Sequence, residues 1–265
     1  MPNTEHKTIK GLGLHDEPLS FSHIKQITPI QSHLANFLKG FASEDVYYRK
    51  WDFDGDAIVD DFWIMDGDTG SSLFSPPATQ ELCGVLSGAT GATDNNAISM
   101  RGQPVIKGDK RAYMHAHFSL SAVTSVQFEV GLIDAVTDAT APVITDVDTP
   151  ASGNGGADIA VIHLDTDQTL TTAAFVCDGS TTGMNCAKTT LSPAFTPTAD
   201  TMVCVRILVD VNDASLIVDN KRVYYVTKSK NIEGGTLLMP WLFFRTRVAT
   251  TRTVKIDMVE IMGER

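Results

Sequence analysis

From about residue 46 to the C-terminus, apolar and polar side chains alternate along the chain with a period of two. Met114, Ala116, Phe118 and Leu120 form the apolar set of the segment Tyr113–Leu120. Successive side chains of a β-strand point to opposite faces, so this pattern predicts strands with one face in a core. The chain also has 68 Thr, Val and Ile residues against 18 Leu, and that balance favours strands over helices.

Two other segments repeat the alternation clearly. Met202–Asp210 places Val203, Val205, Ile207 and Val209 on one face, and Thr253–Met262 is expected to do the same with Val254, Ile256 and Met258. Further predicted strands are Val126–Ile133, Ala157–Leu164, Thr171–Cys177, Ala214–Asn220 and Leu237–Phe244. Turn-rich stretches rather than helices separate these segments, which predicts a single all-β, antiparallel jelly-roll sandwich over residues 46–265.

Residues 1–45 differ from the rest of the chain. Residues 1–28 show no sustained period and contain Gly11, Gly13 and Pro18, so we expect an extended arm. Pro29 is expected to open one short amphipathic helix over about 29–42, which either packs on its own domain or docks on another subunit. The apolar residues expected to bind a partner are Leu12, Leu14, Leu19, Phe21, Ile24, Ile27, Leu34, Phe37 and Phe41.

Charge and hydropathy exclude several classes of partner. The chain has 21 Lys and Arg against 32 Asp and Glu, a formal net charge of -11. Nucleic acid and anionic membrane surfaces both require clustered basic residues, so neither is an expected partner. The longest apolar stretch, Leu237–Phe244, has eight residues and contains Pro240, too short to span a bilayer. The polar start of the chain shows no pattern of a secretory signal, so we expect synthesis in the cytoplasm.

The four cysteines are Cys83, Cys177, Cys186 and Cys204. They are too few for a disulfide framework in a chain of this length, so we expect four reduced and mostly buried thiols. The alternative for Cys177 and Cys186 is a disulfide across a hairpin, because glycines lie between them. No CxxC pair occurs, which disfavours a zinc ribbon.

An Asp-rich segment, Asp52-Phe-Asp54-Gly-Asp56-Ala-Ile-Val-Asp60, is a candidate calcium loop, because calcium takes six to eight oxygen ligands. The EF-hand pattern fails: the glycine stands at loop position four, and Trp63 stands where the pattern needs Glu. The alternative is a turn with solvated Asp52, Asp54, Asp56 and Asp60. Apart from this candidate calcium site, no cofactor is predicted.

Two further groups of residues contain side chains that could bind a metal or catalyse a reaction. His115 and His117 share one face of a strand, as two metal ligands could, but no third ligand is predictable, so we expect them to face solvent or an interface. Lys255-Ile-Asp257-Met-Val-Glu260 invites comparison with the Glu-x-Asp-x-x-Glu strand of jelly-roll glucanases. Lys255 occupies the nucleophile position, and a regular strand would point Asp257 and Glu260 to opposite faces.

No other catalytic motif is present, neither a Gly-x-Ser-x-Gly elbow nor a phosphate-binding glycine loop. The sequence therefore predicts no catalytic residues and a protein that is not an enzyme.

A resemblance to a known family rests on the order of short segments. These are Trp51-Asp-Phe53, Asp68-Thr-Gly-Ser-Ser72, Ala97-Ile-Ser-Met100, Val126-Gln-Phe-Glu-Val-Gly-Leu-Ile-Asp134 and the closing pair Leu238-Met-Pro-Trp-Leu-Phe-Phe-Arg-Thr246 and Thr253-Val-Lys-Ile-Asp-Met-Val-Glu-Ile261. Together they resemble the concanavalin-like (lectin/glucanase) jelly rolls of tailed-bacteriophage virion proteins, over about residues 46–265.

The resemblance implies a virion structural protein, most often a capsid decoration protein on the outer surface of the head. Its expected partners are the major capsid protein and further copies of itself, with a trimer favoured because icosahedral shells offer three-fold positions. The alternative is a carbohydrate-binding, lectin-like module of a phage tail or host-recognition protein.

The arm generates a first testable prediction. Burying five or six of its apolar side chains would contribute roughly 1.5–3 kcal/mol each. Ordering the segment costs a similar amount, so it needs a partner surface. Deleting residues 1–28 should leave the melting temperature nearly unchanged and abolish co-sedimentation with phage heads. Truncated protein that still decorates heads at full occupancy would place the anchor elsewhere.

Overall fold

A computed structural model describes residues 46–53, 61–76, 84–168, 172–179, 184–191, 197–210, 213–219, 221–227, 232 and 235–264. The chain separates into two units, Met1–Gly40 and Phe41–Arg265, and every described residue belongs to the second. The predicted arm and its short helix lie outside the described residues, so both stay predictions.

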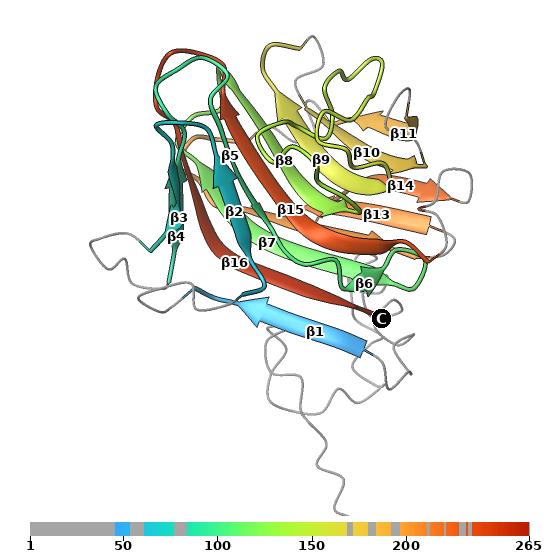
Figure 1. Ribbon diagram of the computed structural model, residues 1–265. Coiled ribbons are helices and arrows are strands. Elements are labelled where there is room, and N and C mark those ends of the chain that lie inside the picture. The colour runs from blue at the N-terminus through green and yellow to red at the C-terminus, as the bar shows by residue number, and fades with distance from the viewer. Residues whose placement is uncertain are drawn as a thin grey trace, which may run out of the picture. The chain divides into compact units, whose positions relative to one another are not determined.

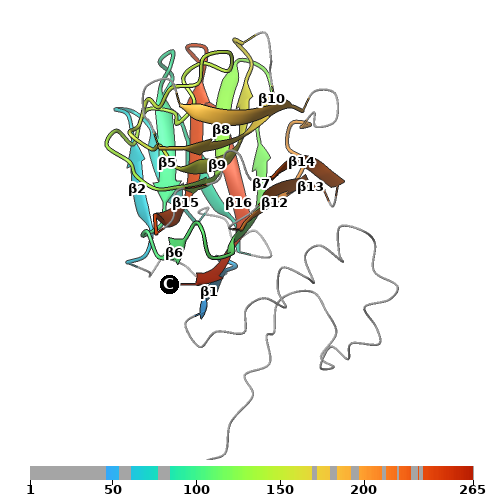
Figure 2. The same ribbon diagram turned by 90° about the vertical axis from the view of Figure 1, so that its right-hand side faces the viewer.

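The described residues form two eight-stranded antiparallel sheets (Figures 1 and 2). Sheet A has the order β14-β13-β12-β7-β16-β4-β3, with β1 added beside β16. Its strands are β1 Val46–Trp51, β3 Ser72–Ser75, β4 Leu86–Ala89, β7 Ala112–Leu120, β12 Val203–Val209, β13 Asp213–Val218, β14 Lys221–Thr227 and β16 Thr253–Glu264.

Sheet B has the order β11-β10-β9-β8-β15-β5-β2, with β6 added beside β15. Its strands are β2 Ile64–Gly67, β5 Ala97–Arg101, β6 Ile106–Lys107, β8 Val126–Ile133, β9 Ile159–Asp165, β10 Thr172–Asp178, β11 Asn185–Thr190 and β15 Leu237–Thr246. The predicted all-β, concanavalin-like jelly-roll sandwich is confirmed. In the described part of the chain there is no helix long and apolar enough to cross a membrane.

The main core lies between the two sheets and is built from alternate residues of their strands. Met114, Ala116 and Phe118 of β7 are at most 1% exposed and belong to it. Val203, Val205, Ile207 and Val209 of β12 pack in the same cluster. The core faces predicted for these two strands from their alternation are therefore confirmed.

Strand β16 departs from the predicted alternation at one point. Its pairing with β7 shifts between Ile256 and Met258, so Asp257 is an extra residue without a partner in the ladder. Before this bulge Val254 and Ile256 face the core, and after it Val259 and Ile261 do. A bulge adds one residue and reverses the phase of the side chains that follow. The prediction that Met258 shares a face with Ile256 is wrong for this reason.

A second apolar cluster covers the other side of sheet B. The segment between β8 and β9 lies over this outer face, and its Val143, Ile144 and Val147 are at most 1% exposed. They pack in one cluster with Phe175 and Trp241 of the sheet. The central strands β8, β9, β10 and β15 of sheet B are consequently buried on both faces.

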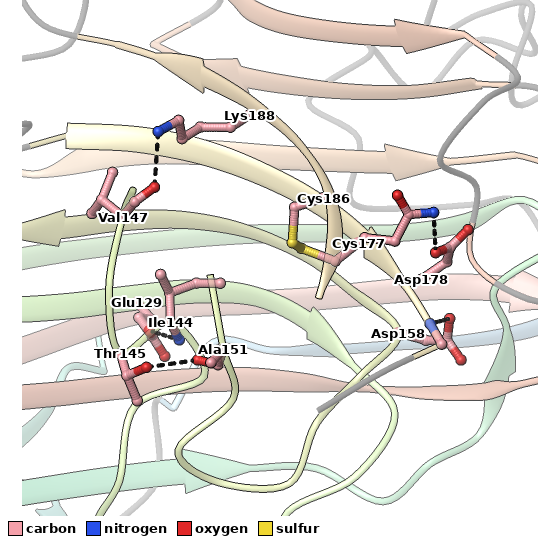
Figure 3. Close-up of a disulfide and its surroundings, with 12 residues drawn as sticks. Glu129, Ile144, Thr145, Val147, Ala151, Asp158, Cys177, Asp178, Cys186 and Lys188 are labelled. Atoms are coloured by element: carbon pink, nitrogen blue, oxygen red, sulfur yellow. Dashed lines mark hydrogen bonds between the residues drawn. A yellow bond between two sulfur atoms is a disulfide. The ribbon is translucent and has the colours of Figure 1, made fainter. Parts of the chain in front are cut away.

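Glu129 of β8 attaches this covering segment to the sheet (Figure 3). The backbone amides of Val143 and Ile144 donate to its two carboxylate oxygens at 2.7 and 2.8 Å. The indole Nε1 of Trp241 donates at 3.0 Å, and Nδ1 of His163 lies at 3.1 Å. Glu129 is fully buried, so these donors replace the water that its carboxylate loses on folding.

The cysteines correct a sequence prediction. Cys177 and Cys186 stand directly opposite each other on β10 and β11 and form a disulfide (Figure 3). The prediction of reduced thiols is wrong for this pair, because the hairpin brings their Cα atoms to 4.0 Å. Cys204 is the free cysteine among the described residues.

Removing the Glu129 acceptor should be costly. Glu129→Gln puts an NH₂ group among four donors, and we expect it to lower the free energy of unfolding by about 3–5 kcal/mol, measured by urea denaturation. Asp138→Asn is the matched control, because Asp138 accepts only from Thr140 at an exposed position. Its expected loss is under about 1 kcal/mol. Equal losses in the two variants would contradict the role given to Glu129.

Reducing the disulfide should also destabilise the fold. The bridge spans a sequence separation of nine residues, for which loop closure predicts about 2–3 kcal/mol. In a domain of this size that corresponds to about 5–10 °C in melting temperature. The double variant Cys177→Ala/Cys186→Ala should not respond to a reductant, and a wild-type protein that responds no more than this variant would contradict the prediction.

Candidate functional site

The outer face of sheet A carries a row of ionisable side chains across four adjacent strands. The strand registers place Lys50 of β1 opposite Glu260 of β16, Glu260 opposite His115 of β7, and His115 opposite Arg206 of β12. Residues paired across neighbouring strands share a face. This row therefore lies on the side of the sheet away from the main core.

His115 lies at the centre of this row. Its Nδ1 is 3.3 Å from Oε2 of Glu260, and its Nε2 is 3.1 Å from Sγ of Cys204. Glu260 is 1% exposed and His115 is 9% exposed. Burial lowers the pKa of His115, which favours the neutral imidazole. A carboxylate only accepts, so the neutral ring carries its proton on Nδ1 and turns a lone pair on Nε2 toward the sulfur.

A second imidazole–carboxylate pair lies beside the first. Nδ1 of His117 is 3.3 Å from Oδ2 of Asp257, and both side chains are about one-third exposed. The rings of His117 and His115 meet edge to face with centroids 4.7 Å apart. The site therefore has a buried pair, His115 with Glu260, and a more accessible pair, His117 with Asp257.

Cys204 brings a thiol to both pairs. It stands opposite His117 in the β7–β12 ladder and is half-buried. Burial raises the pKa of the Cys204 thiol. One ligand atom each from His115, His117 and Cys204 lie within 4.8 Å of one another.

Two tyrosines complete the site at its Glu260 side. Burial and the nearby Glu260 carboxylate raise the pKa of Tyr48 to about 12. Burial, followed by the same carboxylate, also raises the pKa of Tyr113. Both phenols therefore stay protonated at neutral pH.

The structure corrects two predictions about these residues. For His115 the solvent alternative is wrong, because the side chain is buried against Glu260 and Cys204, and the interface alternative stays a prediction. Asp257 and Glu260 do not point to opposite faces, because the bulge at Asp257 places both carboxylates beside histidines of the same face. The third possible metal ligand, Cys204, was missed in the sequence. It lies in the predicted strand Met202–Asp210, on the face opposite to the apolar residues. Only the pairing of β12 with β7 identifies its neighbour.

The other predicted site residues are largely outside the described part of the chain. Of the candidate calcium loop, Asp52 is described: it is exposed and forms an ion pair with Lys50 at 2.7 Å. Asp54, Asp56 and Asp60 lie outside the described residues. The same holds for the nine apolar residues of the arm and helix, from Leu12 to Phe41.

Comparison with known proteins supports the fold at low sequence identity. No family model matches the sequence, and no curated protein matches it significantly. The carbohydrate recognition domain of Emp47p superposes with a TM-score of 0.54 and 13% identity, covering 84% of this chain and 97% of that one. An endo-β-1,4-glucuronan lyase from Trichoderma reesei gives 0.53 and 11%, covering 83% and 95%.

The catalytic domain of an endo-1,3-β-glucanase from Thermotoga petrophila gives a TM-score of 0.53 and 10% identity, covering 84% of this chain and all of that domain. At such identities the likeness shows a shared fold and nothing further. The shared fold is the predicted concanavalin-like jelly roll. The prediction that the chain is not an enzyme is wrong, because the structural neighbours with this fold include a lyase and a glucanase. One of its grounds also fails, since Asp257 and Glu260 lie on the same face of β16 and not on opposite faces.

Proposed function

We propose that this chain recognises carbohydrate through the outer face of sheet A, around Asp257, His117 and Arg206. The observation that carries the proposal is the β16 bulge, which gathers two carboxylates and two imidazoles on one face. Sugar hydroxyls donate to carboxylates and accept from cationic side chains, so such a face offers both kinds of partner. The structural neighbours include a carbohydrate recognition domain, a glucuronan lyase and a glucanase, which supports a carbohydrate ligand.

The outer face of sheet A is the better candidate because the β8–β9 segment covers the centre of the outer face of sheet B. Trp241 and Phe243 on the outer face of sheet B are fully buried beneath the β8–β9 segment. On sheet A, Asp257 and His117 keep about one-third of their side-chain surface. Arg206 of β12 and Lys255 of β16 are half-buried on the two strands that flank β7.

A glycan array followed by titration calorimetry tests this proposal. Asp257→Asn removes a charged acceptor worth about 1.5–3 kcal/mol, so affinity for a bound glycan should fall roughly 10- to 100-fold. Asp66→Asn is the matched control, because Asp66 pairs with Arg101 on sheet B and should leave affinity unchanged. Titrations with and without a chelator separate a direct contact from a metal effect.

The same samples should be assayed for cleavage of any glycan that binds, by release of reducing or unsaturated ends. Cleavage that depends on Asp257 or Glu260 would make the site catalytic. Absence of binding to every glycan, or binding equally reduced by Asp66→Asn, would contradict a carbohydrate role for this face.

As a second candidate function, we propose that the chain decorates the capsid of a tailed phage. Its partners would be the major capsid protein and further copies of itself, with which it would form a trimer. The support is the sequence resemblance and the nine apolar residues that were named for partner binding in the predicted arm and helix. Apolar side chains on an irregular segment need a surface that covers them. Co-sedimentation of the 1–28 deletion with phage heads tests this role.

A further inference from the structure

We propose that His115, His117 and Cys204 form a site for one transition-metal ion of the zinc type. Their ligand atoms lie within 4.8 Å of one another. Tetrahedral zinc with Zn–N bonds near 2.0–2.1 Å and Zn–S bonds near 2.3 Å needs donors about 3.3–3.6 Å apart. The His115 Nε2 to Cys204 Sγ distance is already 3.1 Å, so side-chain adjustment suffices.

The backbone places the three ligand residues side by side, so only their side chains need to adjust. His117 and Cys204 are direct partners in the β7–β12 ladder, and His115 is two residues along β7 on the same face. Both strands lie inside sheet A, between β13 and β16. Ligands on central strands keep their spacing because the ladder sets it.

Glu260 and Asp257 have the role expected around a metal centre. Each contacts the Nδ1 of one histidine, at 3.3 Å in both cases. Carboxylates in this position fix the tautomer of a ligating histidine and leave its other nitrogen for the metal. The two carboxylates also offset the positive charge that zinc and one thiolate would bring.

The donor set selects the metal. Two imidazoles and a thiol suit zinc or a related ion, whereas calcium requires six to eight oxygen ligands. Three protein ligands leave a fourth position, on the side where His117 and Cys204 are half-buried. Water or an exogenous ligand could occupy that position.

The same atoms allow another reading, in which Cys204 is a nucleophile activated by His115 and Glu260. Those three residues stand in the order thiol, imidazole and carboxylate. That reading gives no role to His117 and Asp257, whereas a metal site uses all five residues. The metal site is therefore the better account of the cluster.

Metal binding is tested directly on the full chain. Chelator-treated protein is titrated with Zn²⁺, and with Co²⁺ as a spectroscopic probe, and bound metal is measured by elemental analysis after gel filtration. We expect one ion per chain and a thiolate-to-cobalt charge-transfer band. Zn²⁺ should also slow alkylation of Cys204, followed by peptide mass spectrometry.

Variants separate ligands from their supporting residues. Cys204→Ser should abolish the charge-transfer band and weaken zinc affinity at least 100-fold, and Asp257→Asn should weaken it 10- to 100-fold. His117→Gln, at a more exposed position, serves if Cys204→Ser does not fold. Asp66→Asn is the control and should bind zinc like the wild type.

No bound ion, a cobalt spectrum without the thiolate band, or zinc binding unchanged by both Cys204→Ser and His117→Gln would overturn the proposal. So would rapid, His115-dependent alkylation of Cys204 that Zn²⁺ does not slow. These readouts involve no sugar, so a failure of the carbohydrate proposal leaves the metal result intact.

Discussion

The buried carboxylate of Glu129 is the interaction on which the arrangement of this domain depends. A charge at zero exposure is tolerated only when donors surround it, and here the donors come from β9, β15 and the segment that follows β8. Satisfying Glu129 requires Val143 and Ile144 to lie on the outer face of sheet B. That face is then buried, and the two outer faces of the sandwich become different surfaces.

The asymmetry leaves accessible ionisable side chains, His117 and Asp257, on the outer face of sheet A. Its central strands β16, β7 and β12 carry paired ionisable residues on the outer face, where a regular β16 strand would have pointed Asp257 and Glu260 to opposite faces. One extra residue in β16 reverses the side-chain phase and adds the second carboxylate. The main core keeps its alternation on both sides of the bulge, so the packing between the sheets accommodates the site.

The resulting site combines two imidazole–carboxylate pairs with a thiol, and its residues differ in solvent exposure. Glu260 and His115 are buried, and His117, Asp257 and Cys204 reach the surface. Buried members hold geometry, and half-buried members can meet a ligand. Lectins and polysaccharide-acting enzymes both occur on this fold, so its chemistry has to be determined at the site rather than from the architecture.

The sequence by itself determined the fold class and the core faces of β7 and β12, because side-chain alternation is local and follows directly from strand geometry. It also brought His115 and His117 to one face. The sequence left the Cys177–Cys186 disulfide as an alternative, and the register of the β10–β11 hairpin settles it. The bulge at Asp257 and the approach of Cys204 to the histidines emerge only from the folded chain, because they depend on the pairing of β7 with β16 and β12, which are distant in sequence. Register is a property of paired strands, so no periodicity within one strand can reveal it.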